Sequence, residues 1–459
     1  MAEIKMPTIF GDNMVLQQRS HAAIWGWASP QKRVVVKTSW NGETYKTVAE
    51  KDGSWKVTLQ TSSYGGPYDI NVSDGKSVTF HNVMLGEVWL CSGQSNMEMP
   101  LAGWGRIDNY EQEIANAHYP DIRLFQVSRE TAYSPQYDCK ATGWNPCSPT
   151  TIPDFSATAY FFGREISEKQ NVPVGLIHTS WGGTNVESWI SGEVLKEMPE
   201  FVKTVESIQK MPNDKKTLKA EYLKELTAWN NRVDEGFAEG KPVRAAASLD
   251  DKDWESMNFP GEVGPQLAGF DGVMWVRKEI EIPASWAGKD VQLSLGAIDD
   301  NDITYWNGIE IGRTDGPTLQ RKYIIPEKMV KAGKAILAIR VLDTGGNCGI
   351  WGDLYLRSTN DEQISLSGNW KYQVAADTHK VGALPVDRSV DPNLPTSLYN
   401  AMIHPLISYG IRGAIWYQGE NNSSRAYQYR ELFPLVIENW RRDWKQDFPF
   451  YFVQLANFM

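Results

Sequence analysis

The chain has 459 residues, a net charge of -10 and a pI of about 5.3, and 41% of its residues are hydrophobic. This length predicts about two to four domains. The acidic balance without a basic stripe argues against a nucleic-acid-binding protein, and the lack of an apolar run of about 18 residues argues against a membrane-spanning helix.

Residues 1–82 predict a small β-sandwich of the immunoglobulin-like kind. Short alternating runs recur at close spacing, among them residues 23–27 and 34–40. The dipeptides Asn41-Gly42 and Asp52-Gly53 are typical of hairpin turns. Several short strands joined by such turns favour a sandwich.

Residues 83–245 predict an α/β pattern that continues after an interruption. A strand over 122–127, an amphipathic helix over 156–169 and a strand over 174–177 follow one another. This order indicates right-handed parallel units. Residues 193–240 are rich in Lys and Glu and predict a solvated helical arm.

Residues 246–375 interrupt that pattern with a β signature. Residues 272–283 alternate as a strand does, and Asn307-Gly308 marks a turn. The α/β pattern resumes over 376–459, with helices over 397–408 and 425–444, a strand over 414–417 and a final strand from Phe450. The β segment is therefore expected to be an insertion in an α/β domain.

Ser95 lies where a strand is expected to turn into a helix. An apolar run ends in Ser92-Gly93-Gln94, and polar residues follow the serine. Such a position exposes a hydroxyl and places its N–H at the positive end of a helix. Ser95 and Glu98 also fit a capping box, which is a structural role. The Gly-x-Ser-x-Gly elbow is not met, because Met97 stands where its second glycine would be.

Two later strands end in similar chemistry. The run at 174–177 leads into His178 and then Gly182-Gly183, and the run at 414–417 leads into Gln418-Gly419-Glu420-Asn421. In a parallel sheet the carboxyl ends of the strands line one crevice. We therefore expect Ser95, the Gly182-Gly183 backbone and either Gln418 or Asn421 to converge.

These three segments resemble the SGNH/GDSL hydrolases, and within them the carbohydrate esterases of the sialate O-acetylesterase type. The resemblance implies an α/β fold, an SGNH (flavodoxin-like) three-layer α/β/α domain, and a serine esterase that removes O-acetyl groups from sugars, sialic acids in particular. No cofactor or metal is implied. The implied roles are a nucleophile and oxyanion donors, with one further possible supporting residue. They fall on Ser95, on Gly183 with Gly182 as alternative, on Gln418 with Asn421 as alternative, and on Glu420.

The resemblance also implies an Asp-x-x-His-type segment that we do not find before Met459. A serine needs a base to act as a nucleophile near neutral pH. Among the six histidines, His178 is the best internal substitute, although a packed strand residue is the simpler interpretation, and His404 lies in a helical pattern. We expect residues 1–459 alone to be a poor esterase. We also expect a companion segment or chain carrying Asp and His, which would cover Phe450, Phe452 and Leu455.

The inserted segment resembles the jelly-roll sugar-binding domain that accompanies some β-glycosidases. The resemblance rests on the acidic run 299–302 and on Trp306-Asn307-Gly308. A shared fold does not transfer a sugar-binding role. A non-catalytic carbohydrate-binding protein on an esterase scaffold is therefore the alternative function. A glycoside hydrolase using Glu98 and Glu420 is a third hypothesis.

The cysteines and the first residues bear on the compartment. Four cysteines are too few for a disulfide scaffold; a bridge between Cys139 and Cys147 and buried free thiols both fit the spacing. No Cys-x-x-Cys pair predicts a zinc site. Residues 1–5 lack the basic and apolar regions of a signal peptide, as a mature chain would. We expect a periplasmic or secreted protein whose signal peptide has been removed.

Overall fold

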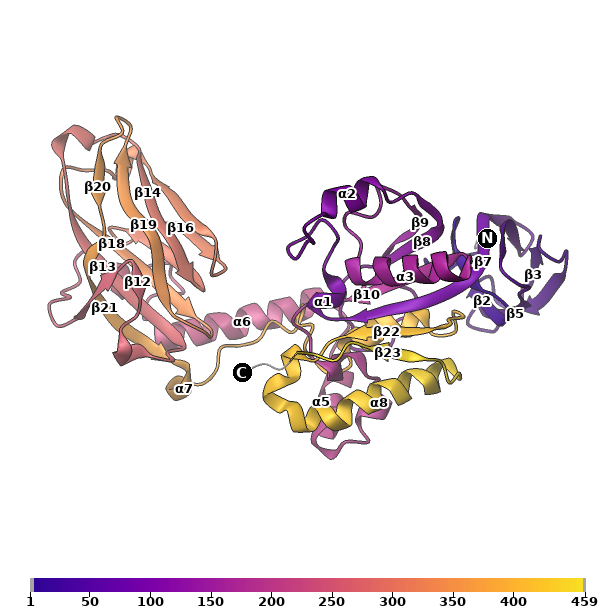
Figure 1. Ribbon diagram of the computed structural model, residues 1–459. Coiled ribbons are helices and arrows are strands. Elements are labelled where there is room, and N and C mark those ends of the chain that lie inside the picture. The colour runs from indigo at the N-terminus through magenta and orange to yellow at the C-terminus, as the bar shows by residue number, and fades with distance from the viewer. Residues whose placement is uncertain (1–3, 457–459) are drawn as a thin grey trace. The chain divides into compact units, whose positions relative to one another are not determined.

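The computed structural model describes residues 4–456, which fall into two compact units (Figure 1). One unit comprises Met1–Lys215 and Arg388–Met459, and the other comprises Lys216–Asp387. The last three positions of the expected terminal segment, 457–459, lie outside the described residues. Below, each unit is described by itself.

The first part of the larger unit is antiparallel β structure in two sheets. One sheet has the order β4-β3-β6-β7, and β2 pairs with β5 in the other. Val36 of β3 and Leu59 of β5 belong to the same buried core, so the two sheets enclose a common interior. The strands are β1 (Val15–Gln17), β2 (His21–Trp27), β3 (Arg33–Thr38), β4 (Thr44–Val48), β5 (Ser54–Gln60), β6 (Gly65–Ser73) and β7 (Ser77–Gly93).

Strand β7 connects this β structure with the central sheet of the same unit. Its first part pairs antiparallel with β6, ending at the pair Gly65 and Leu85. From Glu87 to Gly93 it pairs in parallel with β10. One continuous strand of 17 residues thus belongs to two sheets.

The central sheet has the order β9-β8-β10-β7-β22-β23, with every neighbouring pair parallel except β8 and β9. Numbered along the chain, its five parallel strands lie in the order 2-3-1-4-5. This order differs from the 2-1-3-4-5 order of flavodoxin itself. An apolar run indicates a buried strand but does not determine its neighbours, and β10 lies between β7 and β8. The strands are β8 (Tyr119–Val127), β9 (Ala141–Cys147), β10 (Val174–Ser180), β22 (Gly413–Tyr417) and β23 (Phe450–Phe452).

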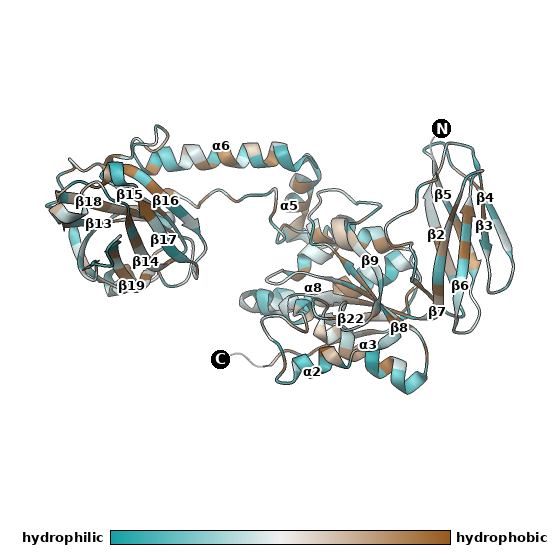
Figure 2. Ribbon diagram, turned by 90° about the horizontal axis from the view of Figure 1, so that it is seen from above, coloured by the Kyte–Doolittle hydropathy of each residue, from teal (hydrophilic) through white to brown (hydrophobic). Residues whose placement is uncertain are grey.

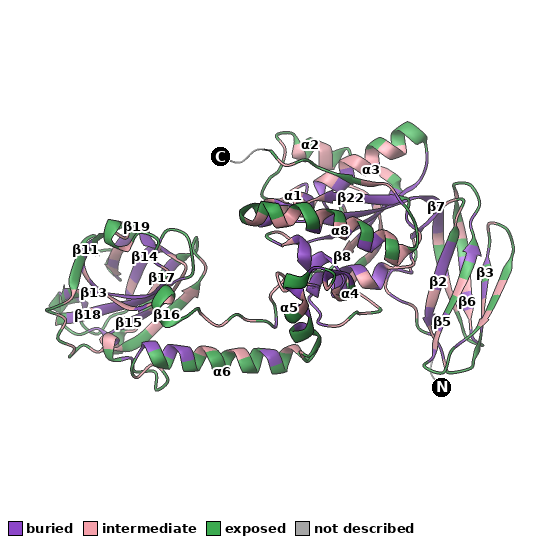
Figure 3. Ribbon diagram, turned by 90° about the horizontal axis from the view of Figure 1, so that it is seen from below, coloured by how far each residue is buried: buried purple, intermediate pink, exposed green. Residues whose placement is uncertain are grey.

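Helices pack on both faces of this sheet (Figure 1). Trp89 and Cys91 share a core with Tyr160 of α3, whereas Leu90 shares another core with Trp440 of α8. Alternate residues of one strand point to opposite faces, which explains the division. Figure 3 shows the buried strands between partly exposed helices. The helices are α1 (Ser95–Glu98), α2 (Tyr110–Ala115), α3 (Ala157–Gln170), α4 (Gly192–Leu195), α5 (Pro199–Gln209) and α8 (Ala426–Trp444).

The other unit is built from two antiparallel sheets around an apolar core (Figure 2). Their orders are β11-β21-β13-β18-β15-β16 and β12-β19-β14-β17, with β20 paired to β19. The unit is longer than the predicted insertion, because it includes nearly all of α6. The elements are α6 (Lys215–Val233), β11 (Glu255–Phe259), β12 (Gly261–Glu262), β13 (Gly272–Ile282), β14 (Val291–Asp299), β15 (Asn301–Trp306), β16 (Ile309–Asp315), β17 (Gln320–Ile325), β18 (Gly333–Asp343), β19 (Gly349–Ser358), β20 (Gln363–Ser365), β21 (Gly368–Asp377) and α7 (Thr378–Val381).

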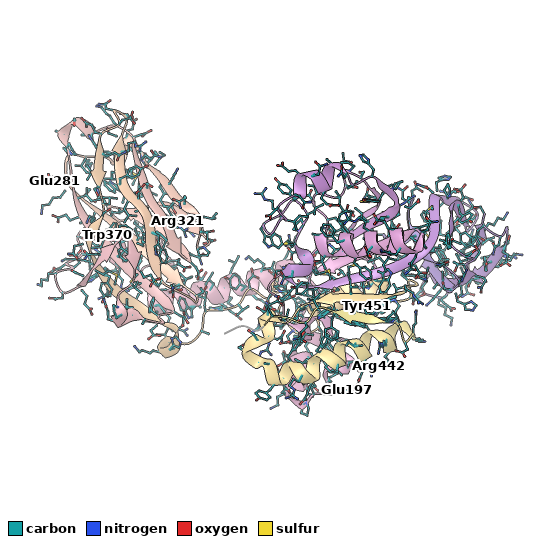
Figure 4. All side chains as sticks on the ribbon, in the orientation of Figure 1. Glu197, Glu281, Arg321, Trp370, Arg442 and Tyr451 are labelled. Carbon is teal, nitrogen blue, oxygen red and sulfur yellow. The ribbon has the colours of Figure 1, made fainter. Side chains whose placement is uncertain are left out.

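Labelled side chains show how differently two parts of the chain are packed (Figure 4). Arg321 of β17 is fully buried and pairs with Asp302 at 2.9 Å. Tyr451 of the edge strand β23 is 55% exposed and stacks on Trp89, with the ring centroids 5.7 Å apart.

All four cysteines are free thiols, which excludes the bridge between Cys139 and Cys147 in this structure. Across residues 4–456, every helix is too short or too polar to cross a bilayer.

Candidate active site

Three strand ends meet at Gly93. The register places Ser180 of β10 on one side of Gly93 and Tyr417 of β22 on the other. A Cβ atom on Gly93 would lie 2.1 Å from the carbonyl oxygen of Tyr417, so only glycine fits between these strands. The residues that follow each strand therefore leave the sheet at the same edge, and they include Ser95 and the predicted glycine and amide residues.

Ser95 opens the short helix α1 and is half-buried. Gln94 occupies the cap position without a side-chain cap hydrogen bond. The side chain of Glu98 is engaged by Arg129 and by the backbone of Gly182. The capping box is therefore not formed. Within residues 4–456 the Ser95 hydroxyl makes no hydrogen bond, which leaves its oxygen available for attack.

The glycine turn after β10 lies directly beside Ser95. A methyl group on Gly182 would lie 3.4 Å from the Cβ of Ser95 and 3.3 Å from Oε2 of Glu98. The Gly182 N–H donates to that carboxylate. The Gly183 N–H makes no hydrogen bond to any described residue, and Gly183 adopts a φ of 69° with open space around it. The geometry therefore favours Gly183 over Gly182 as an oxyanion donor.

Both N–H donors of the Gln418 amide are engaged in the interior. Gln418 is 2% exposed, and its Nε2 donates to the Thr184 carbonyl at 3.0 Å and to Oδ1 of Asn422 at 2.7 Å. Asn422 also accepts from the Val186 N–H and donates to Glu187, which fixes the orientation of both amides. A primary amide has two N–H donors, and both are used here. Gln418 is therefore held away from the role that the sequence resemblance implied for it.

Asn421 lies at the exposed edge of the same turn. Its Nδ2 donates to Oδ1 of Asn185 at 2.7 Å, so one of its two donors has no partner within residues 4–456. The turn is anchored to the serine segment by Oε1 of Gln94, which accepts from the N–H groups of Gly419 and Asn421 at 3.2 and 3.4 Å. These contacts favour Asn421 as the amide nearest to a reacting group at Ser95.

Several positioning residues were missed by the sequence reasoning. Gln94 holds the β22 turn, and Asn96 donates to Oε1 of Glu420 at 2.7 Å. Arg129, two residues beyond β8, pairs with Oε1 of Glu98 at 2.8 Å. Gln94 and Asn96 flank Ser95 in the sequence, and this position was the signal that could have identified them. Arg129 carried no signal, because nothing local indicated that its strand end adjoins α1.

The two carboxylates of the glycoside hydrolase hypothesis are bonded to other residues of the site. Both oxygens of Glu98 have partners, the Arg129 guanidinium and the Gly182 N–H. Glu420 accepts from Asn96 through one oxygen, and its Oε2 is buried without a partner in the described part of the chain. Neither arrangement resembles a pair of free carboxyl groups flanking a glycosidic bond.

His178 is not placed to act on Ser95. Its Nε2 lies 2.6 Å from the Ser180 hydroxyl, and its ring packs against Phe155. Complete burial lowers the pKa of His178 to about 4, so it is neutral near pH 7. His404 makes its own hydrogen bond to the Gln136 carbonyl at 2.7 Å. In residues 4–456 no histidine hydrogen-bonds Ser95. His178 therefore takes the packed role that its strand pattern favoured.

Part of the chain is similar in sequence to known proteins. Residues 85–220 and 382–459 match the family model described as carbohydrate esterase, sialic acid-specific acetylesterase. The two segments are therefore similar in sequence to this family. The recognition made from the sequence motifs is thereby confirmed, and the two matched segments contain Ser95, the glycine turn and the β22 turn.

Individual relatives give the extent of the match. A sialate O-acetylesterase of Homo sapiens is 33% identical over 210 residues, which are 42% of this chain and 40% of that protein. The sialate O-acetylesterase of Mus musculus is 33% identical over 201 residues, covering 40% of this chain and 37% of its own. The chain thus spans at most 40% of the length of these curated relatives.

One solved structure supports the fold of the whole chain. A carbohydrate acetylesterase from Xanthomonas citri aligns with a TM-score of 0.54 and 22% identity, covering 99% of this chain and 61% of that one. At this identity the alignment bears on the fold alone. It confirms a mixed α/β protein with much sheet.

Proposed function

We propose that this chain carries the nucleophile and oxyanion donors of a carbohydrate esterase that removes O-acetyl groups from sugars, sialic acids in particular. The observation that supports this most is the register at Gly93, where Ser180 and Tyr417 are its neighbours. It brings a free serine hydroxyl, a free glycine N–H and an amide with an unused donor to one edge of a parallel sheet. Acyl transfer needs this combination.

In the proposed reaction, Ser95 Oγ attacks the acetyl carbonyl carbon and loses its proton to a base. The carbonyl oxygen becomes an oxyanion that accepts from the N–H groups of Ser95 and Gly183 and from the Asn421 amide. The C–O bond to the sugar then breaks, the base returns the proton to the departing alkoxide, and an acetyl-serine remains. Water attacks the acetyl-serine in the same way and releases acetate.

We propose that the base comes from a polypeptide segment other than residues 4–456. The Gln418 Oε1 and Trp416 Nε1 atoms are buried and without partners in the described chain. Both residues line a cavity of about 260 Å³ whose wall includes Phe452 and Leu455. Phe452 is 53% exposed, whereas Phe450 and Leu455 are half-buried. Exposed apolar groups beside unpaired polar atoms fit a surface that another segment covers.

The finer architecture and location are part of the same proposal. We assign the α/β part to an SGNH-type domain with its own strand order. The β segment near 246–375 is proposed as a jelly-roll insertion, residues 1–82 as an immunoglobulin-like sandwich, and the compartment as periplasmic or secreted. Helices on both faces of the central sheet and two sheets around one core in the insertion support the first two assignments.

Hydrolysis of 4-nitrophenyl acetate with chemical rescue tests the function. The chain of residues 1–459 is assayed alone and with added imidazole, and Ser95→Ala is assayed in parallel to subtract the reaction of imidazole in solution. We expect slow turnover alone and a clear, Ser95-dependent acceleration by imidazole. An acetylated peptide containing Ser95, detected by mass spectrometry, would identify the intermediate.

Two results would change the assignment. Full turnover without imidazole would show that a described residue, His178 first, supplies the base. No Ser95-dependent reaction under any condition, with retained binding of a sugar, would favour the alternative of a non-catalytic carbohydrate-binding protein. That alternative draws on the lack of a histidine bonded to Ser95 within residues 4–456.

A further inference from the structure

A cationic and an aromatic side chain lie together next to Ser95. Arg129 follows β8, and Trp181 is the first residue after β10. The Arg129 guanidinium lies 6.0 Å from the centre of the Trp181 ring, and its Nη1 lies 2.8 Å from Oε1 of Glu98. Glu98 is the last residue of α1, the helix that Ser95 begins, and also binds Gly182. Arg129 is therefore two contacts away from the glycine turn beside the nucleophile.

Most of the Arg129 guanidinium is still available. Its side chain is 55% exposed, and only Nη1 has a hydrogen-bond partner among the described residues. A guanidinium has five N–H donors in a planar fork, which matches the two oxygens of a carboxylate. The nearby cations Lys140 and Lys215 are both paired with Glu130 at 2.7 Å. Arg129 thus keeps an unpaired donor edge at the site.

We infer that Arg129 recognises the carboxylate of the substrate and so determines specificity for an acidic sugar over neutral acetylated sugars. This inference rests on the proposed function. The chain has a net charge of -10, so an anionic substrate needs a local cation to be held at the site. Glu98 fixes one end of the guanidinium and the Trp181 face supports it, which pre-organises the remaining donors. Trp181 also offers a flat apolar surface for a sugar ring.

A purely structural role predicts a different result. If Arg129 served only to orient Glu98, and through it Gly182, its removal would weaken acidic and neutral ligands equally. If Arg129 binds a carboxylate, its removal weakens the acidic ligand alone. A ligand pair that differs only in charge therefore separates the two roles.

The test compares N-acetylneuraminic acid with its methyl ester, because esterification removes the negative charge and keeps the ring. Dissociation constants are measured by calorimetry or ligand-observed NMR at pH 7 for the chain, for Arg129→Gln and for Arg313→Gln. Arg313 is a matched control in the other unit, with 60% exposure and a pair to Glu310 at 2.8 Å. Acetyl transfer from 4-nitrophenyl acetate is followed in the same preparations.

We expect the unmodified chain and Arg313→Gln to bind the acid about tenfold more tightly than the methyl ester. This ratio corresponds to the low end of the free energies of hydrogen bonds to charged groups, because the Arg129 side chain is 55% exposed. Arg129→Gln should lose this ratio and bind the methyl ester as before. Equal binding of the two ligands by the unmodified chain would overturn the inference, as would equal weakening of both in Arg129→Gln. In either case Ser95-dependent acetyl transfer would leave the proposed function standing. Binding of neither sugar would overturn the inference, and loss of acetyl transfer as well would overturn both proposals.

Discussion

One buried polar cluster in each compact unit can be compared, and the two clusters differ in how completely they are hydrogen-bonded. In the unit of residues 216–387, Asp302 and Arg321 are completely buried and fully satisfied. Arg321 also donates to the carbonyls of Gly316 and Asp300, and Tyr323 donates to Asp302. At the β22 end of the other unit, Trp416 Nε1, Gln418 Oε1 and Glu420 Oε2 are buried without partners in the described chain.

The difference separates a structural network from a site. Buried polar groups in folded proteins are nearly always hydrogen-bonded, so a closed network indicates a structural role. The unpaired atoms at the β22 end fit the proposal that another molecule or segment completes the bonding there. The predictions below set one unit against the other, or one side of the site against its neighbour.

The largest effect is expected at Ser95, the proposed nucleophile. Ser95→Ala should reduce imidazole-rescued hydrolysis of 4-nitrophenyl acetate to the rate in buffer with imidazole, because no acetyl-serine can form. Its thermal midpoint should stay within the error of the unmodified chain. Ser63→Ala, an exposed serine of the N-terminal β structure, is the control and should keep the full rate. An unchanged rate in Ser95→Ala would remove the serine from the mechanism.

Next is the closed network of the other unit. Asp302→Ala leaves the Arg321 guanidinium buried and uncompensated, which should cost about 3–5 kcal/mol of unfolding free energy. Replacing both, as Asp302→Leu with Arg321→Met, should cost less because no charge stays buried. Denaturant titration measures both. Acetylation of Ser95 should be unaffected under native conditions, and a parallel loss of it would mean that the two networks are not independent.

A third prediction divides two amides of one turn. Asn421→Ala should lower the rescued turnover by about 10²–10³ through loss of an oxyanion donor, without a change in thermal midpoint. Gln418→Ala should lower the thermal midpoint, because the buried Thr184 carbonyl and Asn422 lose their donor. Turnover and thermal unfolding are measured on both variants. A stable but inactive Gln418→Ala, beside an active Asn421→Ala, would restore the sequence-based assignment.

The smallest effect concerns the buried histidine behind the site. Burial lowers the pKa of His178 from the usual 6.5 to about 4, so between these values the unfolded chain binds more protons than the folded one. Stability should therefore fall as the pH drops from about 6.5 to about 4, by on the order of 3 kcal/mol at most. Unfolding free energies measured across this range should vary less in His178→Gln, and exposed His118→Gln should behave as the unmodified chain. An identical pH slope in all three would contradict the buried neutral state.

The sequence allowed the strand ends to be predicted, because their signals are local. Apolar runs ending in glycine mark buried strands, and the glycine at position 93 is required by the close approach of Tyr417. Strand order could not be predicted, since any apolar strand can lie beside another. The choice between Gln418 and Asn421 could not be made either, because it depends on which amide the interior already occupies. The place of Arg129 beside Glu98 depends on the same unpredicted topology.

The length of β7 has a consequence for how Ser95 is held in place. The strand runs without a break from Ser77 to Gly93, two residues before Ser95. Where β7 enters the central sheet, its residues Met84 to Gly86 pair with β1. In addition, the Val88 N–H donates to Oε1 of Gln17 at 2.9 Å. The N-terminal β structure and the segment that carries Ser95 thus share one strand, and the N-terminal part supports the position of the serine. Deleting the N-terminal β structure would remove the first part of β7, its pairing with β1 and the Gln17 hydrogen bond, so Ser95 should lose its fixed position as well.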